Sequence, residues 1–241
     1  MDIIQEKCVG CGHCAIFCPM HAITVNAVAH IDPEKCVECF NCVRSGCPAD
    51  AIKPSKLSWP QSLAESLSNP TGVDEKSGVS GRGTAEMKTN EVTGRIGHGK
   101  VGLCMELGRP GTGTTFADVE KICMTLARHG VIFEPLNPVT YVMKDTTTGE
   151  MKEEVRNVRV LSAIVEGLTD ADKLEEVLRD CYEASKQIDT VFSVGVSSLV
   201  RQDGTTYFDD AIEALGLEMY ESGKTNVGLG YPRFDFQGGS K

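Results

Sequence analysis

The chain has 241 residues, which is enough for two domains, the larger with its own hydrophobic core. Its formal net charge of -10 argues against nucleic acid as a partner, because phosphate binding depends on clustered Lys and Arg. No stretch has the roughly 18 consecutive apolar residues of a membrane-spanning helix, and cysteines and acidic residues interrupt the start, where a signal peptide would be apolar. We therefore expect a cytoplasmic protein without a membrane span.

Eight of the eleven cysteines lie in two similar runs near the start of the chain. The runs are Cys8-x2-Cys11-x2-Cys14-x3-Cys18-Pro19 and, 28 residues later, Cys36-x2-Cys39-x2-Cys42-x4-Cys47-Pro48. Two-residue spacers let three thiolates curl around one face of an iron–sulfur cluster, while the fourth ligand comes from elsewhere. The odd cysteine total and the lack of an export signal argue against a secreted disulfide scaffold. The runs therefore predict two 4Fe-4S clusters.

Residues 1–52 resemble a bacterial-type dicluster ferredoxin, in the tandem cysteine runs and in the Ala22-Ile23 and Ala51-Ile52 pairs that follow each proline. In that family the fourth cysteine of each run binds the other cluster. The resemblance implies two ligand sets: Cys8, Cys11, Cys14 and Cys47 for the first cluster, and Cys36, Cys39, Cys42 and Cys18 for the second. It also implies a function in the transfer of single electrons.

Two positions depart from the family pattern. The spacer before Cys47 has four residues where three are usual, which bears on Cys47 as a ligand, and Phe40 stands where glycine is common. A zinc site is the alternative, but zinc ligands form two Cys-x2-Cys pairs separated by a gap, whereas here three tandem cysteines occur twice. His13 and His21 flank the first run and are expected beside the cluster or in solvent, because eight thiolates already complete both sets.

Residues 53–98 are rich in Gly, Pro, Ser and charged residues, with little apolar periodicity beyond a short turn near Leu63 and Leu67. We predict an extended arm or linker. Connections of this length without secondary structure are usually either disordered or functional. Two interpretations stay open: a flexible tether, or an arm that orders along a partner subunit, which Trp59, Met87 and the mixed charges favour.

The remainder is predicted as a packed domain at residues 99–221 and a tail at 222–241. The predicted elements, in chain order, are a strand at 101–107, a helix at 115–129, a hairpin of 140–144 with 155–166, a helix at 170–187, a strand at 190–196 and a short helix near 208–215. Capping boxes mark both long helices, Thr115 with Asp118 and Thr169 with Asp172.

This order of elements predicts an α+β fold, the ferredoxin-like βαββαβ sandwich, in which two helices cover one face of an antiparallel sheet. The fold hosts many unrelated functions and identifies none of them. The loop at 107–115 resembles the first loop of ACT regulatory domains, where a small effector binds, and Arg109 with the first helix amides could hold an anion. A tight glycine turn is the alternative interpretation.

The remaining cysteines, Cys104, Cys123 and Cys181, are expected as buried core thiols. No Walker A loop, nucleophile elbow or His-Glu-x-x-His motif is present, so no catalytic residue is assigned. The arm and second domain exceed what a mobile ferredoxin needs and offer surface for permanent docking. We therefore expect an electron-transfer subunit that serves a larger catalytic subunit of an anaerobic oxidoreductase, either a flavoprotein or a molybdenum or tungsten enzyme.

Two other functions stay open at this point. The chain could be a freely diffusing ferredoxin-type carrier that serves several enzymes. It could instead be a redox-responsive regulator whose ACT-like domain binds a metabolite. Homo-oligomerisation through the α+β domain is a further expectation about its assembly.

Overall fold

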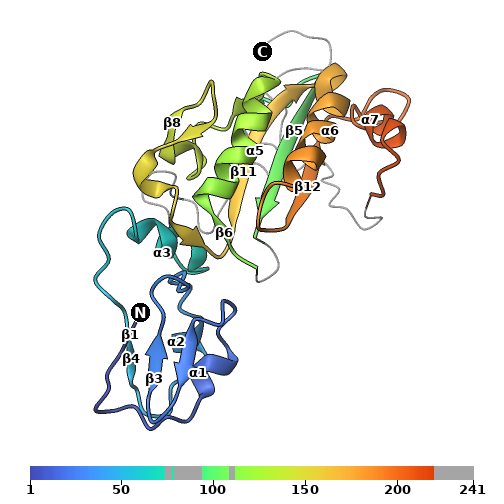
Figure 1. Ribbon diagram of the computed structural model, residues 1–241. Coiled ribbons are helices and arrows are strands. Elements are labelled where there is room, and N and C mark those ends of the chain that lie inside the picture. Colours follow the sequence, from blue (N-terminus) through green and yellow to red (C-terminus); the bar gives the residue numbers. More distant parts are fainter. Residues whose placement is uncertain (74–77, 79–93, 109–111, 220–241) are drawn as a thin grey trace.

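The computed structural model describes residues 1–73, 78, 94–108 and 112–219 (Figure 1). Within these residues the chain forms a small N-terminal module and a larger α/β domain, with helix α3 (Ser62–Ser68) lying between them (Figure 1). Met87 of the predicted arm, Arg109 of the predicted effector loop and the predicted tail lie outside the described residues.

The N-terminal module is built from two copies of one short pattern. Each cysteine run leads into a single turn of helix, α1 (His13–Ile16) in the first run and α2 (Asn41–Arg44) in the second. Two antiparallel strand pairs complete the module: β2 (Ile23–Val25) with β3 (Ala29–Ile31), and β1 (Asp2–Ile3) with β4 (Ile52–Lys53). The second pair closes the module by joining its first residues to its last.

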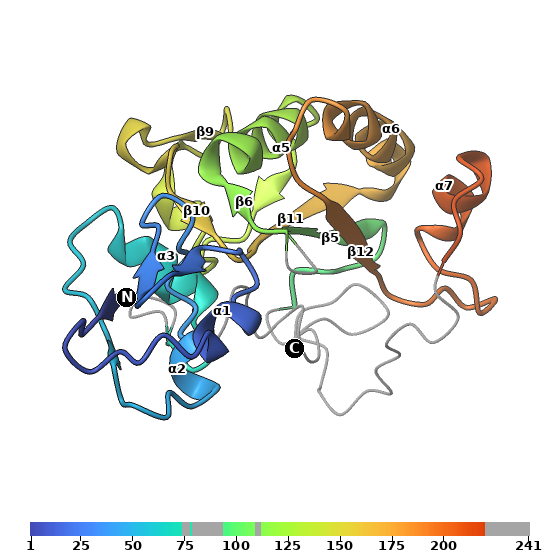
Figure 2. The same ribbon diagram turned by 60° about the horizontal axis from the view of Figure 1, so that its bottom comes forward.

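The larger domain contains a four-stranded antiparallel sheet in the order β12-β5-β11-β7. Its strands are β5 (Lys100–Leu107), β7 (Ile132–Phe133), β11 (Ala163–Asp170) and β12 (Phe192–Ser197). Two helices, α5 (Phe116–Arg128) and α6 (Leu174–Ser185), cover one face of the sheet (Figure 2). The described residues therefore form a mixed α/β structure with its core between the sheet and these helices.

Strand alternation explains which side chains build this core. On β5, Val101, Leu103, Met105 and Leu107 are fully buried and belong to the same apolar cluster as the inner residues of α5 and α6. Successive strand residues point to opposite faces, so Cys104 lies on the other face of the sheet, while Cys123 and Cys181 are buried on the two helices. All three thiols are buried, as the sequence predicts.

One of the two predicted capping boxes is present. The backbone N–H of Asp118 donates to Oγ1 of Thr115 over 3.3 Å at the start of α5. The second prediction is wrong, because Thr169 lies inside β11, opposite Val101, and α6 is instead preceded by the 3-10 turn η3 (Ala171–Lys173) without a side-chain cap. A residue held in the sheet cannot place its hydroxyl over a helix start.

The predicted hairpin of 140–144 with 155–166 is also wrong. β8 (Met143–Asp145), which follows the 3-10 turn η1 (Thr140–Val142), pairs with β9 (Glu150–Met151), whereas β11 pairs with β5 and β7. The strand of the main sheet that the sequence analysis missed is β7, whose two residues are too few to give an alternating pattern. The short strands β6 (Thr114–Thr115) and β10 (Arg159–Val160) pair with each other beside the main sheet.

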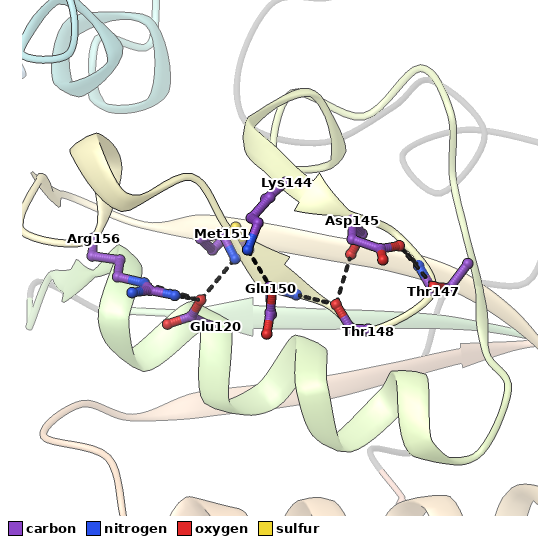
Figure 3. A network of polar contacts seen from close by, with 8 residues as sticks. All are labelled: Glu120, Lys144, Asp145, Thr147, Thr148, Glu150, Met151 and Arg156. Carbon is purple, nitrogen blue, oxygen red and sulfur yellow. Dashed lines mark hydrogen bonds and ion pairs between the residues drawn. The ribbon is translucent and has the colours of Figure 1, made fainter.

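The β8–β9 hairpin is fastened to α5 through Glu120 (Figure 3). One oxygen of this carboxylate accepts from the N–H of Met151 over 2.8 Å, and from Nε and Nη2 of Arg156 over 3.1 and 2.9 Å. Arg156 follows the 3-10 turn η2 (Glu153–Val155). At the hairpin tip, Lys144 and Glu150 form an exposed ion pair of 3.2 Å.

Helix α3 lies within the segment predicted as an extended arm, and here the structure differs from the prediction. Leu63, Ala64 and Leu67 are buried in the apolar cluster of the α/β domain. Next to them, Oγ of Ser68 accepts from the N–H of Leu161 over 2.8 Å. A helix of seven residues shows fewer than two turns of pattern, which explains why the sequence indicated only a turn.

The chain continues from β12 to a short helix, α7 (Asp209–Ala214), which matches the short helix predicted near 208–215. Among the described residues, no helix is long and apolar enough to cross a membrane.

Candidate metal centres

The first cavity of the N-terminal module is lined by four thiols. They come from Cys8, Cys11, Cys14 and Cys47. The cavity encloses about 350 Å³, including space open to solvent, and its other walls are mostly apolar residues. The structure thus brings the last cysteine of the second run to the first three cysteines of the first run.

The second cavity has the complementary set of thiols. It encloses about 330 Å³ and is lined by Cys18, Cys36, Cys39 and Cys42. Both groups of four are those that the ferredoxin resemblance implied, although the assignment of each cysteine as a ligand stays a prediction. A 4Fe-4S cluster places its four thiolates at four separate corners, so they do not converge on one point. Among the described residues, no three His, Cys, Asp or Glu side chains are grouped closely enough to hold a single metal ion.

Backbone amides point at three of these sulfurs. The N–H groups of Ala22, Ala29 and Ala51 donate to Sγ of Cys18, Cys8 and Cys47 over 3.2, 3.3 and 3.4 Å. All three alanines are buried, and their small side chains let the backbone come close to the sulfur. Such hydrogen bonds stabilise negative charge on a thiolate ligand and so influence the potential of a bound cluster.

Burial disfavours ionisation of the thiols around the second cavity. Desolvation raises the pKa of Cys36 to about 12, with the nearby Glu38 carboxylate adding to the effect. It raises the pKa of Cys42 to about 11 and also raises that of Cys39, where the charge of Arg44 acts in the opposite direction. Without a cation these sulfurs stay protonated near neutral pH. A set of four soft thiols in an apolar cavity fits iron, whose positive charge reverses this preference.

The four-residue spacer does not displace Cys47 from the first cavity. His13 Nε2 donates to the carbonyl oxygen of Ser45 over 3.0 Å, and the ring of His13 also packs on Phe17. The Ser45 hydroxyl donates to the carbonyl oxygen of Cys42 over 3.0 Å. These contacts hold the longer spacer against the first run, so His13 lies beside the cavity as a supporting residue, as the sequence predicts.

Phe40 adopts the backbone conformation that explains why glycine is common at its position. It precedes α2 with φ +60°, just as Gly12 precedes α1 with φ +77°. This left-handed conformation costs about 1 kcal/mol for a residue with a Cβ atom. The side chain of Phe40 lines the second cavity and packs on the module's apolar cluster, which offsets the cost.

Residues 7–57 match the family model described as a 4Fe-4S dicluster domain. The N-terminal module is a 4Fe-4S dicluster domain. It carries 4Fe-4S clusters, and its two cavities provide one site for each of two. The matched residues are about a fifth of the chain.

Two ferredoxins are similar to part of the chain, over the dicluster domain. An uncharacterised ferredoxin of Methanocaldococcus jannaschii is 59% identical over 29 residues, which are 12% of this chain and 50% of that protein. A ferredoxin of Pyrobaculum islandicum is 34% identical over 65 residues, which are 26% of this chain and 60% of that protein. The chain thus spans between half and three-fifths of the length of these relatives. No solved structure matches the chain.

The second cavity of the dicluster domain lies on the side that meets the α/β domain. Met20, which lines this cavity, packs against Gly113 at the start of β6. Arg44 of α2 reaches beyond the dicluster domain to Asn69, at the end of α3. The sequence analysis missed both contacts.

The predicted effector loop at 107–115 is described only in part. The N–H groups of Thr112 and Gly113 both donate to the carbonyl oxygen of Gly108, over 3.2 and 3.0 Å. These hydrogen bonds bring the two described ends of the loop together. Arg109 lies outside the described residues, and the anion site at this loop stays a prediction.

Proposed function

We propose that this chain is an electron-transfer subunit that passes single electrons to or from a larger catalytic subunit of an anaerobic oxidoreductase. A ferredoxin-like 4Fe-4S domain implies electron transfer, because each bound cluster takes up and releases one electron. The catalytic partner must couple this relay to two-electron chemistry, and a flavin or a molybdenum or tungsten centre provides such coupling. We place the assembly in the cytoplasm.

The observation that carries the proposal is the position of α3. This helix begins five residues after the matched dicluster segment ends at residue 57, and its apolar side chains are buried in the core of the α/β domain. The dicluster domain is therefore held directly on a larger folded domain. Such an arrangement supports a fixed place in an assembly, where the α/β domain provides docking surface.

The dicluster domain itself exposes apolar side chains near its cysteines. Val9 is 69% exposed, Ile16 is 78% exposed and Phe17 is 44% exposed. All three belong to the first cysteine run, in which Cys11 is also exposed. Exposed apolar side chains beside a cluster favour contact with a partner that brings its own redox centre close.

We further propose that the α/β domain is a ferredoxin-like βαββαβ unit. The sheet and its helices follow the chain in the order β5, α5, β7, β11, α6 and β12, and the first strand lies centrally beside the third. β6, the β8–β9 hairpin and β10 are insertions into this plan. This domain could also mediate contact between two copies of the chain.

Anaerobic purification of the native protein tests the proposed function. We expect a larger subunit to copurify in constant ratio, with flavin, molybdenum or tungsten detected alongside iron. Reduction of the clusters should then depend on the substrate of that subunit. A monomeric protein that purifies alone and exchanges electrons with several unrelated reductases would contradict the proposal.

The second candidate function is that of a freely diffusing ferredoxin-type carrier. The two similar proteins favour it because both are named ferredoxins. The same purification distinguishes the two functions, since a carrier needs no constant partner. The effector loop of the regulator hypothesis includes residues that the structure does not describe, and this hypothesis stays a prediction.

A further inference from the structure

Arg44 links the two parts of the chain through a single guanidinium group. It is the last residue of α2 and lies between Cys42 and Cys47. Its Nη2 donates to the carbonyl oxygen of Cys39 over 2.6 Å, and its Nη1 donates to Oδ1 of Asn69 over 3.1 Å. One acceptor belongs to a loop that lines the second cavity, and the other lies outside the dicluster domain.

Asn69 is held firmly enough to act as an anchor. Its side chain is buried, and Oδ1 also accepts from the N–H and hydroxyl of Thr71 over 3.2 and 2.9 Å. Its own N–H donates to the carbonyl oxygen of Glu65 in α3 over 2.8 Å. The preceding residue, Ser68, is bonded to Leu161 of the α/β domain. The position of the Asn69 oxygen is therefore determined by the larger domain.

An arginine suits this bridge better than another cation. Its planar guanidinium offers several N–H donors in a fixed fork, so it binds two acceptors at the same time and keeps its charge at any physiological pH. Lysine carries the same charge as a single flexible point and does not span two fixed acceptors in the same way.

We propose that Arg44 is a positioning residue that couples the cluster site at Cys18, Cys36, Cys39 and Cys42 to the α/β domain. Because Asn69 holds the guanidinium group of Arg44, the positive charge of this group stays beside the Cys39 loop. The charge favours the reduced form of a cluster bound at this site. The potential of one cluster thus depends on a residue that the dicluster domain does not contain. This inference requires the clusters and is independent of which enzyme the chain serves.

The size of the effect is limited because the arginine side chain is exposed. Reduction adds one negative charge, which a nearby cation stabilises, but solvent and salt screen exposed charges. We expect about a threefold change in the equilibrium constant for reduction of one cluster when the charge is removed. At 59 mV per tenfold change for a one-electron couple, this corresponds to about 28 mV toward more negative potential.

The test is a redox titration of the full holoprotein, monitored by electron paramagnetic resonance, for Arg44→Gln, Asn69→Ala and the double variant. We expect Arg44→Gln to move one of the two one-electron steps to more negative potential and to leave the other in place. Asn69→Ala should move the same step in the same direction by a smaller amount, because the freed guanidinium can swing into solvent. In the Arg44→Gln background, Asn69→Ala should have no further effect.

Lys7→Gln is the matched control. Lys7 lies next to Cys8 of the first cavity and is exposed, and its ion pair is with Asp50 rather than with α3. Removing the charge of Lys7 should leave unchanged the potential of the one-electron step that moves in Arg44→Gln. Arg44→Lys, which keeps the charge, should restore most of the potential lost in Arg44→Gln.

Three results would overturn the proposal. Both steps could stay in place in Arg44→Gln, both could move equally, or the effects of Arg44→Gln and Asn69→Ala could simply add. If Arg44→Gln fails to bind its clusters, Asn69→Ala still decides the question, because it leaves the dicluster domain intact. An unchanged titration in Asn69→Ala then contradicts the coupling.

Discussion

Met20 and Gly113 pack against each other where the dicluster domain meets the α/β domain. A Cβ atom added to Gly113 would lie 2.6 Å from Cε and 3.1 Å from Sδ of Met20. Gly113 also has φ +70°, a conformation that residues with a Cβ atom rarely adopt. The close approach of the second cluster site to the α/β domain therefore depends on a glycine at this position.

Gly113→Ala is expected to destabilise this junction. The left-handed backbone costs about 1 kcal/mol for alanine, and displacement of Met20 adds to it. Met20→Ala in the same chain should recover the part caused by crowding. Thermal unfolding of the natural protein, Gly113→Ala, Met20→Ala and the double variant measures the backbone cost and the crowding cost.

Gly204→Ala separates the backbone cost from the crowding cost. Gly204 also has a positive φ, +86°, but a Cβ atom there would meet nothing within 4 Å. Gly113→Ala should therefore lower stability more than Gly204→Ala does. Equal losses in the two variants, or no recovery in Met20→Ala, would show that the Met20 contact contributes nothing.

The sequence predicted best those features that short patterns encode. Cysteine spacing predicted the 4Fe-4S dicluster domain, and Thr115 with Asp118 predicted the start of α5. Both depend on residues only a few positions apart. The hairpin was wrong because β11 pairs with β5 and β7, which both lie far from it in sequence, and β7 has only two residues.

The contacts between the two parts of the chain could not be predicted in the same way. Arg44 donates a hydrogen bond to Asn69, which lies 25 positions later in the chain. Ser68 accepts one from Leu161, which lies 93 positions later. None of these residues stands out by type, since an arginine, an asparagine and a serine are ordinary surface residues. Only the burial of α3 brings them together.

Removal of iron is expected to unfold the dicluster domain and to leave the α/β domain folded. Among the described residues, the buried apolar cluster of the dicluster domain has four members, Met1, Ile23, Ala29 and Cys42, whereas the α/β domain has an extensive core. A module with so little buried apolar surface depends on its metal for stability. Hydrogen exchange measured by mass spectrometry, before and after anaerobic chelation, compares the two regions.

The pattern of protection decides the outcome. Amides in β5 and β11 should stay protected after chelation, while those in β2 and β3 lose protection. Rebuilding the clusters with iron and sulfide should restore it. Full protection of β2 and β3 in the iron-free protein would contradict the prediction.

Glu120→Gln is expected to loosen the β8–β9 hairpin from α5 (Figure 3). The carboxylate is largely buried, and one oxygen serves both Arg156 and the N–H of Met151. Weakening hydrogen bonds to a charged group costs about 1.5–3 kcal/mol. The matched control is Glu150→Gln in the same hairpin, whose ion pair with Lys144 is exposed and should contribute less than about 1 kcal/mol. Urea unfolding measures both, and a loss in Glu150→Gln as large as that in Glu120→Gln would contradict this ranking.

Cys123 and Cys181 are expected to make the α/β domain less stable at high pH. Burial raises the pKa of Cys181 from 9.0 to about 12 and raises that of Cys123 well above 9.0, with neighbouring carboxylates adding to both shifts. The contribution of each thiol to stability is therefore complete well below pH 9 and is lost as the pH rises above 9, because the unfolded chain ionises first.

Between pH 8 and 10, Cys181 alone should lower the free energy of unfolding by about 1 kcal/mol. Cys181→Ala is less stable at pH 8 because it leaves a small cavity, but its stability should fall less between the two pH values. Urea unfolding of the α/β domain at both pH values, followed by circular dichroism, gives the difference. Equal pH dependence in the natural protein and Cys181→Ala would show that the buried thiol does not cause the loss.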